Sequence, residues 1–201
     1  MIKKKNKLFL GLSILMGLVV ISSNFLVQFP VNYYGLEKIL TYGAFSYPIT
    51  FLITDLANRA YGKDSAKKIV YIGFAIGISL TLFISTNFTD IISIRIAIGS
   101  GIAFFVAQNI DIQIFDRLRK NRTWFVAPLV SSLFGSVVDT FLFFSISFYK
   151  SGVPWVTLAF GDLFVKMIVA LAMLIPFRFL IIYVKEISLK KNQKNFFKNL
   201  V

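Results

Sequence analysis

Six long apolar stretches follow one another along the chain and constrain its fold more than any other feature. A helix needs about 20 apolar residues to cross the roughly 30 Å hydrocarbon core of a bilayer. Stretches of about this length occupy residues 8–29, 39–61, 69–86, 94–115, 124–149 and 155–184. The chain is also 57% hydrophobic, with a mean hydropathy of +0.75. We therefore predict a single all-α integral membrane domain over residues 1–201, with six transmembrane helices.

The positive charges predict how these helices are oriented. Four Lys or Arg lie in residues 1–7, four in 59–68, four in 117–122 and five after residue 184. The loops on the other side hold only Lys38, Arg95 and Lys150. Basic loops stay in the cytoplasm, so both termini are predicted to be cytoplasmic, which requires an even number of helices. The net charge of +13 is thereby explained without a nucleic-acid partner.

The composition excludes several kinds of chemistry. The chain has no His and no Cys, which removes disulfides, thiol nucleophiles, His bases and the usual zinc or haem ligand sets. It also lacks the GxxxxGK[ST] loop that binds nucleotide phosphates. We therefore expect no metal, no cofactor and no enzymatic activity. A membrane enzyme such as a lipid transferase would need clustered acidic motifs, commonly with His.

Carboxylates inside the apolar stretches are the candidate functional groups. A charge at the centre of a membrane helix costs about 2.5–3.5 kcal/mol on insertion scales. Asp111 and Asp139 have no charge partner within one turn of their own helices, so each needs another helix, water, a proton or a substrate. Gln108 and Asn109 add amide groups beside Asp111. Ionisable residues within a membrane are by default candidates for a functional site.

For other polar residues a structural role is as well supported by the sequence as a functional role. Asp55 with Arg59, and Asp162 with Lys166, are four residues apart and share a helix face, where each pair is able to satisfy its own charges. Asn24 and Gln28, near the end of the first stretch, are expected to pack against other helices or to lie at the interface.

Proline adds two further expectations. Pro48 removes a backbone donor and is expected to kink the second stretch. The second and fifth stretches each carry a Pro followed by an Asp, Pro48 with Asp55 and Pro128 with Asp139. This pattern suggests two inverted three-helix halves, as in many secondary transporters, although the two spacings differ.

Four segments carry a resemblance to a known family: SSNFLVQFP, TYGAFSYPITFLITDLANRAYG, AQNIDIQIFDRLRKNRTWFVAPLVSSLFGSVVDTFLFFSISF and GDLFVKMIVALAMLIPF. They cover about residues 22–177, and the block 108–144 is the most specific. The chain resembles the VUT family of bacterial inner-membrane transporters, and within it the queuosine precursor transporters. The matching polar positions are Asn24, Gln28, Asp55, Gln108, Asp111, Asp139, Asp162 and Lys166.

The resemblance implies import of a deazaguanine, 7-cyano-7-deazaguanine and/or 7-aminomethyl-7-deazaguanine, across the cytoplasmic (inner) membrane by a secondary transporter. A carboxylate can accept two adjacent N–H donors from the pairing edge of such a base, as side chains do on nucleic-acid bases. We expect Asp139 or Asp111 to hold this edge, with help from Gln108 or Asn109. The alternative is a substrate-binding membrane subunit of an ATP-energised vitamin uptake system.

Overall fold

The computed structural model describes residues 2–85, 91–120 and 123–198, most of which are helical. Within this part of the chain the elements, in order, are α1 (Ile2–Leu26), the short 3-10 helix η1 (Leu36–Lys38), α2 (Gly43–Ser46), α3 (Ile49–Tyr61), α4 (Lys63–Ser85), α5 (Ile91–Leu118), α6 (Val126–Phe148) and α7 (Trp155–Lys198). The prediction of an all-α protein is therefore confirmed for the described residues.

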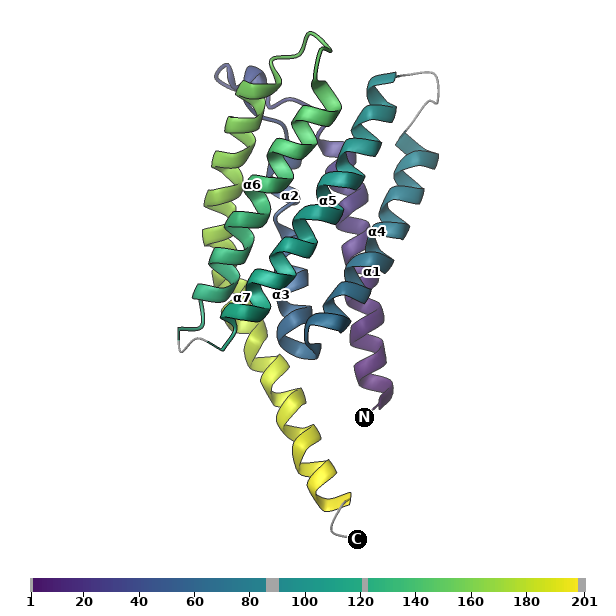
Figure 1. Cartoon of the computed structure of the whole chain (residues 1–201), viewed down its shortest axis with the longest axis vertical. Helices are drawn as coiled ribbons and strands as arrows, with labels where there is room; N and C mark the ends of the chain where they lie inside the picture. The colour runs from purple at the N-terminus through teal and green to yellow at the C-terminus, as the bar shows by residue number, and fades with distance from the viewer. Residues whose placement is uncertain (1, 86–90, 121–122, 199–201) are drawn as a thin grey trace.

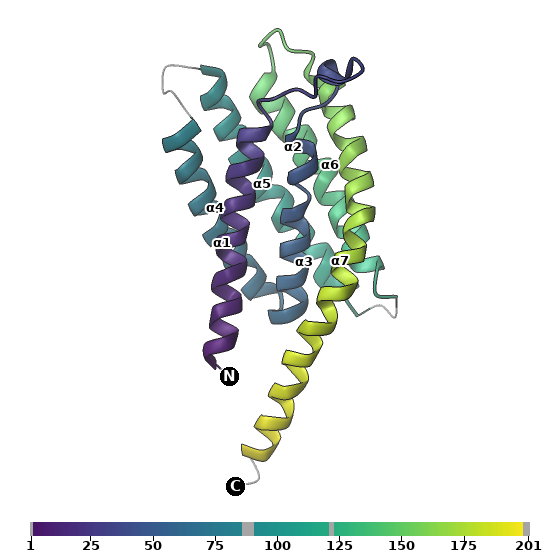
Figure 2. The same ribbon diagram turned by 180° about the vertical axis from the view of Figure 1, so that it is seen from behind.

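The helices lie side by side in one bundle, with α2 and α3 following each other along the same path (Figures 1 and 2). Both ends of the chain lie at the same end of this bundle, together with the α3–α4 and α5–α6 links. These are the segments in which the basic residues gather. We call this end the basic end; the links α1–α2 and α6–α7 lie at the opposite end.

Four of the described helices are long and apolar enough to cross a membrane: Lys7–Leu26, Ile94–Leu118, Val126–Phe148 and Trp155–Ile182. They correspond to the predicted first, fourth, fifth and sixth spans. The other two predicted spans are not among them. Helix α4 begins at Lys63, earlier than residue 69, and so includes charged residues in its first turns. The second predicted span is broken. The total of six crossings therefore stays a prediction.

The second predicted span, 39–61, is not one continuous helix. Residues 39–42 precede α2, and the helix is interrupted at Tyr47 and Pro48 before α3 begins. The proline has no N–H to donate, which explains a break where we predicted a kink. Helix α1 ends at Leu26 rather than at residue 29, and α7 continues to Lys198, beyond the predicted end at 184. The predicted end of the third span, at 86, lies outside the described residues.

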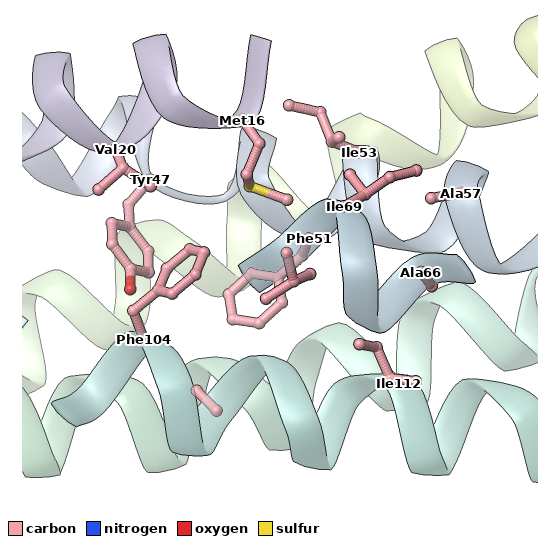
Figure 3. Packing of buried hydrophobic residues seen from close by; sticks show 12 residues of the cluster. Met16, Val20, Tyr47, Phe51, Ile53, Ala57, Ala66, Ile69, Phe104 and Ile112 are labelled. Atoms are coloured by element: carbon pink, nitrogen blue, oxygen red, sulfur yellow. The ribbon is translucent and has the colours of Figure 1, made fainter. Parts of the chain in front are cut away.

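One cluster of the apolar core lies where α1, α3, α4 and α5 meet. Figure 3 shows Met16 and Val20 of α1 facing Phe51, Ile69 and Phe104. On the outer surface, by contrast, α7 exposes large apolar side chains, as expected for a helix in contact with lipid. They include Phe160, Phe164, Ile168, Ile175 and Phe179.

In the first half of the chain α1 packs mainly against α4, whereas in the second half α5 packs mainly against α6. The two halves therefore use different helix pairs for their most extensive contacts. The inverted relation between them stays a prediction.

Gly161 places α7 against the segment that leads into α2. A Cβ atom at this position would overlap the backbone carbonyl oxygen of Ile39, which has no flexible end that can move away. Gly161→Ala is therefore expected to lower the thermal stability of the purified chain, because α7 would have to shift. Gly11→Ala is the matched control, because a Cβ there meets nothing within 4 Å. Equal melting temperatures for the two variants would contradict this packing.

Candidate functional site

A buried cluster of two carboxylates around one ammonium lies between α6 and α7. The Lys166 Nζ atom lies 2.9 Å from Asp139 Oδ2 and 2.6 Å from Asp162 Oδ2. Lys166 also donates a hydrogen bond of 3.2 Å to Thr140 Oγ1, and Thr140 donates one of 2.9 Å to Asp162. All three charged side chains are almost fully buried. The predicted Asp162–Lys166 pair is thus confirmed, and Lys166 is the partner from another helix that Asp139 required.

This cluster forms one wall of a narrow, partly open pocket. Residues from five helices, from the turn after α1 and from the break between α2 and α3 line it: Ser23, Asn24, Val27, Gly43, Tyr47, Ser100, Asp139, Phe143, Asp162 and Lys166. Interrupted helices commonly line the binding sites of secondary transporters. We call this the central pocket.

Two buried polar atoms in the central pocket lack a hydrogen-bond partner among the described residues. They are Asp139 Oδ1 and the hydroxyl oxygen of Tyr47, and these two side chains lie close enough to interact with each other. The Tyr47 ring also lies beneath the Lys166 ammonium, with 4.8 Å between Nζ and the ring centroid. A buried polar atom without a partner costs free energy. Asp139 is therefore available to bind a donor group that enters the pocket.

Asn24 lies in the central pocket, whereas Gln28 lies at its margin. Asn24 is buried near the end of α1, and its Oδ1 accepts a hydrogen bond of 2.5 Å from Ser100 of α5. The exposed Gln28 donates to the backbone oxygen of Asn24, at 3.3 Å. Of the two amides predicted on this stretch, only Asn24 lines the pocket.

Asp55 and Asp111 form a separate acidic pair, nearer the basic end of the bundle. Asp55 accepts hydrogen bonds from Ser131, at 3.2 Å, and from Ser132, at 3.4 Å. The predicted Asp55–Arg59 ion pair does not form, because the Arg59 side chain instead donates to the backbone oxygen of Arg119, at 2.7 Å. Neither carboxylate lines the central pocket.

Gln108 and Asn109 lie outside the central pocket. Gln108 is fully buried and joins α5 to α3, accepting a hydrogen bond from Thr54 and donating one to Thr50. Asn109 faces α4 instead, where it accepts a hydrogen bond of 3.0 Å from the Tyr71 hydroxyl. The structure thus brings Asp139, Asp162, Lys166 and Asn24 together, and places the two amides of α5 elsewhere.

Sequence reasoning missed the aromatic side chains of the pocket. Tyr47 and Phe143 line it, together with Ser100 and Gly43. The position of Tyr47 directly before Pro48 is the signal that could have identified it, because a helix break in a membrane is tolerated where it lines a cavity. Phe143 stands four residues after Asp139 and shares its helix face, but in a Phe-rich stretch this spacing is not distinctive.

Apolar helices long enough to cross a bilayer, arranged around a buried charged pocket, define the class: a multi-pass membrane protein. The family model described as "Putative vitamin uptake transporter" matches residues 41–181. The chain therefore belongs to this family of membrane transporters, which confirms the resemblance seen in the sequence.

Three named relatives match most of the chain. The "Queuosine precursor transporter" of Escherichia coli is 34% identical over 86% of this chain and 86% of its own length. The "Probable queuosine precursor transporter" of Haemophilus influenzae is 32% identical over 87% of this chain and 86% of its own length. A protein of the same name from Bacillus subtilis is 27% identical over 81% of this chain and 80% of its own length. No solved structure matches the chain.

Proposed function

We propose that the protein imports queuosine precursors, 7-cyano-7-deazaguanine and/or 7-aminomethyl-7-deazaguanine, across the cytoplasmic membrane as a secondary transporter. The names of the three relatives support this substrate class. The observation that carries the proposal is the carboxylate of Asp139, buried in the central pocket with one oxygen that accepts no hydrogen bond from the described residues. Such an oxygen suits the N–H donors on the pairing edge of a deazaguanine.

The chemistry of the pocket fits each part of such a base. One N–H of the pairing edge donates to Asp139 Oδ1, and the neighbouring carboxylate of Asp162 offers a second acceptor. Asn24 lies in the same pocket, and the rings of Tyr47 and Phe143 pack against the faces of the base. Charge-assisted hydrogen bonds of this kind are strong in a site shielded from water.

The proposed membrane arrangement has six crossings with both termini in the cytoplasm. In it α2 and α3 together form the second crossing and α4 forms the third. The position of both chain ends and both basic links at one end of the bundle supports this arrangement (Figures 1 and 2). The positive-inside rule then makes the basic end the cytoplasmic one.

Complementation of a bacterium tests the function. The host lacks its own importer, cannot make queuosine precursors and contains no added ATPase module. Feeding either deazaguanine is expected to restore queuosine in tRNA, scored by a mobility-shift gel. The aminomethyl form should restore queuosine at a lower concentration than the cyano form. The two carboxylates and one ammonium give the pocket a net charge of −1, which attracts the cationic aminomethyl group.

Failure of both deazaguanines, with the protein present in the membrane, would contradict the proposed substrate. If restoration required an added ATPase module, the chain would instead be a substrate-binding subunit of an ATP-energised system. An empty vector is the control for diffusion of the precursor.

A further inference from the structure

The acidic pair of Asp55 and Asp111 is a second buried ionisable site, and the proposed substrate contacts do not use it. Asp55 on α3 is 2% exposed and Asp111 on α5 is 0% exposed. Both Asp55 oxygens accept serine hydroxyls, whereas neither Asp111 oxygen accepts a hydrogen bond from the described residues. Ser131 lies beside both carboxylates, which are close enough for their charges to act on each other.

Among the residues that the structure describes, no Lys or Arg forms an ion pair with either carboxylate of the acidic pair. Helix α6 faces Asp55 with the hydroxyls of Ser131 and Ser132. Helix α4 contributes apolar residues, among them Ala66, Ile69 and Val70, to the core cluster that contains Ile112, the neighbour of Asp111 in the sequence. Helix α7 contributes Ala170, Met173, Leu174 and Phe177 to a small pocket that Asp55 also lines.

Two adjacent carboxylates without a cation cannot both stay ionised in a buried site. The serine hydrogen bonds stabilise the ionised form of Asp55, because a hydroxyl donates to a carboxylate. Ser132 donates to Asp55 alone, whereas Ser131 lies beside both carboxylates, so the pair holds one proton between its two members. The O–H of the protonated member is a donor for the other carboxylate.

We propose that the Asp55–Asp111 pair binds the proton whose inward movement drives uptake of the substrate. This inference rests on the proposed transport function and adds its energy source. A proton entering from outside converts the Asp111 carboxylate to a carboxylic acid. Its release through Asp55 to the small pocket on the basic side restores the carboxylate, so that one proton crosses in each cycle.

Helix α6 connects this pair to the central pocket. Ser132, Ser136 and Asp139 are spaced by four and three residues, so they lie on one helix face. The distance from Ser132 to Asp139 is about 10 Å along the axis, at 1.5 Å per residue. Between them lies the buried Ser136 hydroxyl, which has no hydrogen-bond partner among the described residues. Polar groups thus follow α6 from the substrate contact to the acidic pair.

Infrared spectroscopy of the purified full chain in lipid tests the bound proton without any substrate. At neutral pH the wild type is expected to show the carbonyl band of a protonated carboxylic acid. Asp111→Asn removes this band, whereas Asp116→Asn, which changes a carboxylate paired with Arg119 outside the site, keeps it. Absence of the band in the wild type, or its persistence in Asp111→Asn, would overturn the proposal.

Proteoliposomes test the coupling. An inside-alkaline gradient of one pH unit is expected to support about tenfold accumulation of the deazaguanine in the wild type, if one proton enters per substrate. Asp111→Asn should lose this accumulation and keep substrate exchange at equal concentrations, because asparagine imitates the protonated acid. Asp55→Asn, a second variant, should also lose accumulation, and Asp116→Asn should retain it.

The outcomes separate the two proposals. Accumulation by Asp111→Asn equal to that of the wild type would overturn proton coupling at this pair, and so would accumulation driven by a sodium gradient alone. Loss of exchange as well as accumulation in Asp111→Asn would show a role in substrate binding or folding instead. If the wild type exchanged neither deazaguanine, the proposed function would fail, while the infrared band would still decide whether the pair holds a proton.

Discussion

Lys166→Met is expected to lower the free energy of unfolding by about 3–5 kcal/mol, the usual cost of removing one partner from a buried ion pair. The ammonium touches two carboxylates, Asp139 and Asp162, and both would be left buried without their cation. Thermal unfolding of the purified chain in detergent measures the effect. Lys68→Met, at an exposed position on α4, is the control and should change the melting temperature little.

A combined variant separates lost charge balance from lost packing. Lys166→Met with Asp139→Asn and Asp162→Asn leaves no unpaired charge in the central pocket, so much of the stability should return even though transport does not. If the single and combined variants melted at the same temperature, the ionic cluster would not be the source of the destabilisation.

Asp139→Asn is expected to reduce uptake of labelled deazaguanine by roughly 10- to 100-fold, because one charge-assisted hydrogen bond is worth about 1.5–3 kcal/mol. The variant should remain folded, since Lys166 keeps its 2.6 Å contact with Asp162 and its hydrogen bond to Thr140. The measurement is initial uptake in cells that contain equal amounts of protein. Asp116→Asn removes a carboxylate far from the pocket along α5 and should transport normally. Normal uptake by Asp139→Asn would remove Asp139 from the substrate site.

The helical architecture and part of the site could be predicted because both depend on patterns local in the sequence. Apolar stretches long enough to cross a bilayer correctly predicted α1, α5, α6 and α7. The four-residue spacing of Asp162 and Lys166 correctly placed both residues on one face of α7. The basic clusters identified the segments that gather at one end of the bundle (Figure 1). These signals follow from helix geometry and from the cost of burying charge, which act within a single segment.

Contacts between helices could not be predicted in the same way. No local sequence pattern shows that Asp139 contacts Lys166, 27 residues later, or that Gln108 forms its hydrogen bonds with Thr50 and Thr54. Helical periodicity placed Asp55 and Arg59 on one face, but serines of α6 and a carbonyl group after α5 are their actual partners. Tertiary packing determines which partner a buried polar group has, because such a group forms hydrogen bonds with the partners that the packed helices bring close to it.

Substrate counterflow in proteoliposomes that contain only this chain tests the central claim most directly. Vesicles loaded with unlabelled deazaguanine are placed in labelled deazaguanine at equal concentration, without ATP, any ion gradient or another protein. We expect labelled substrate to enter the wild-type vesicles, and Asp139→Asn to exchange it much more slowly than Asp116→Asn. Absence of exchange by a folded wild-type chain would contradict transport by this protein alone, and equal exchange by Asp139→Asn would contradict the site.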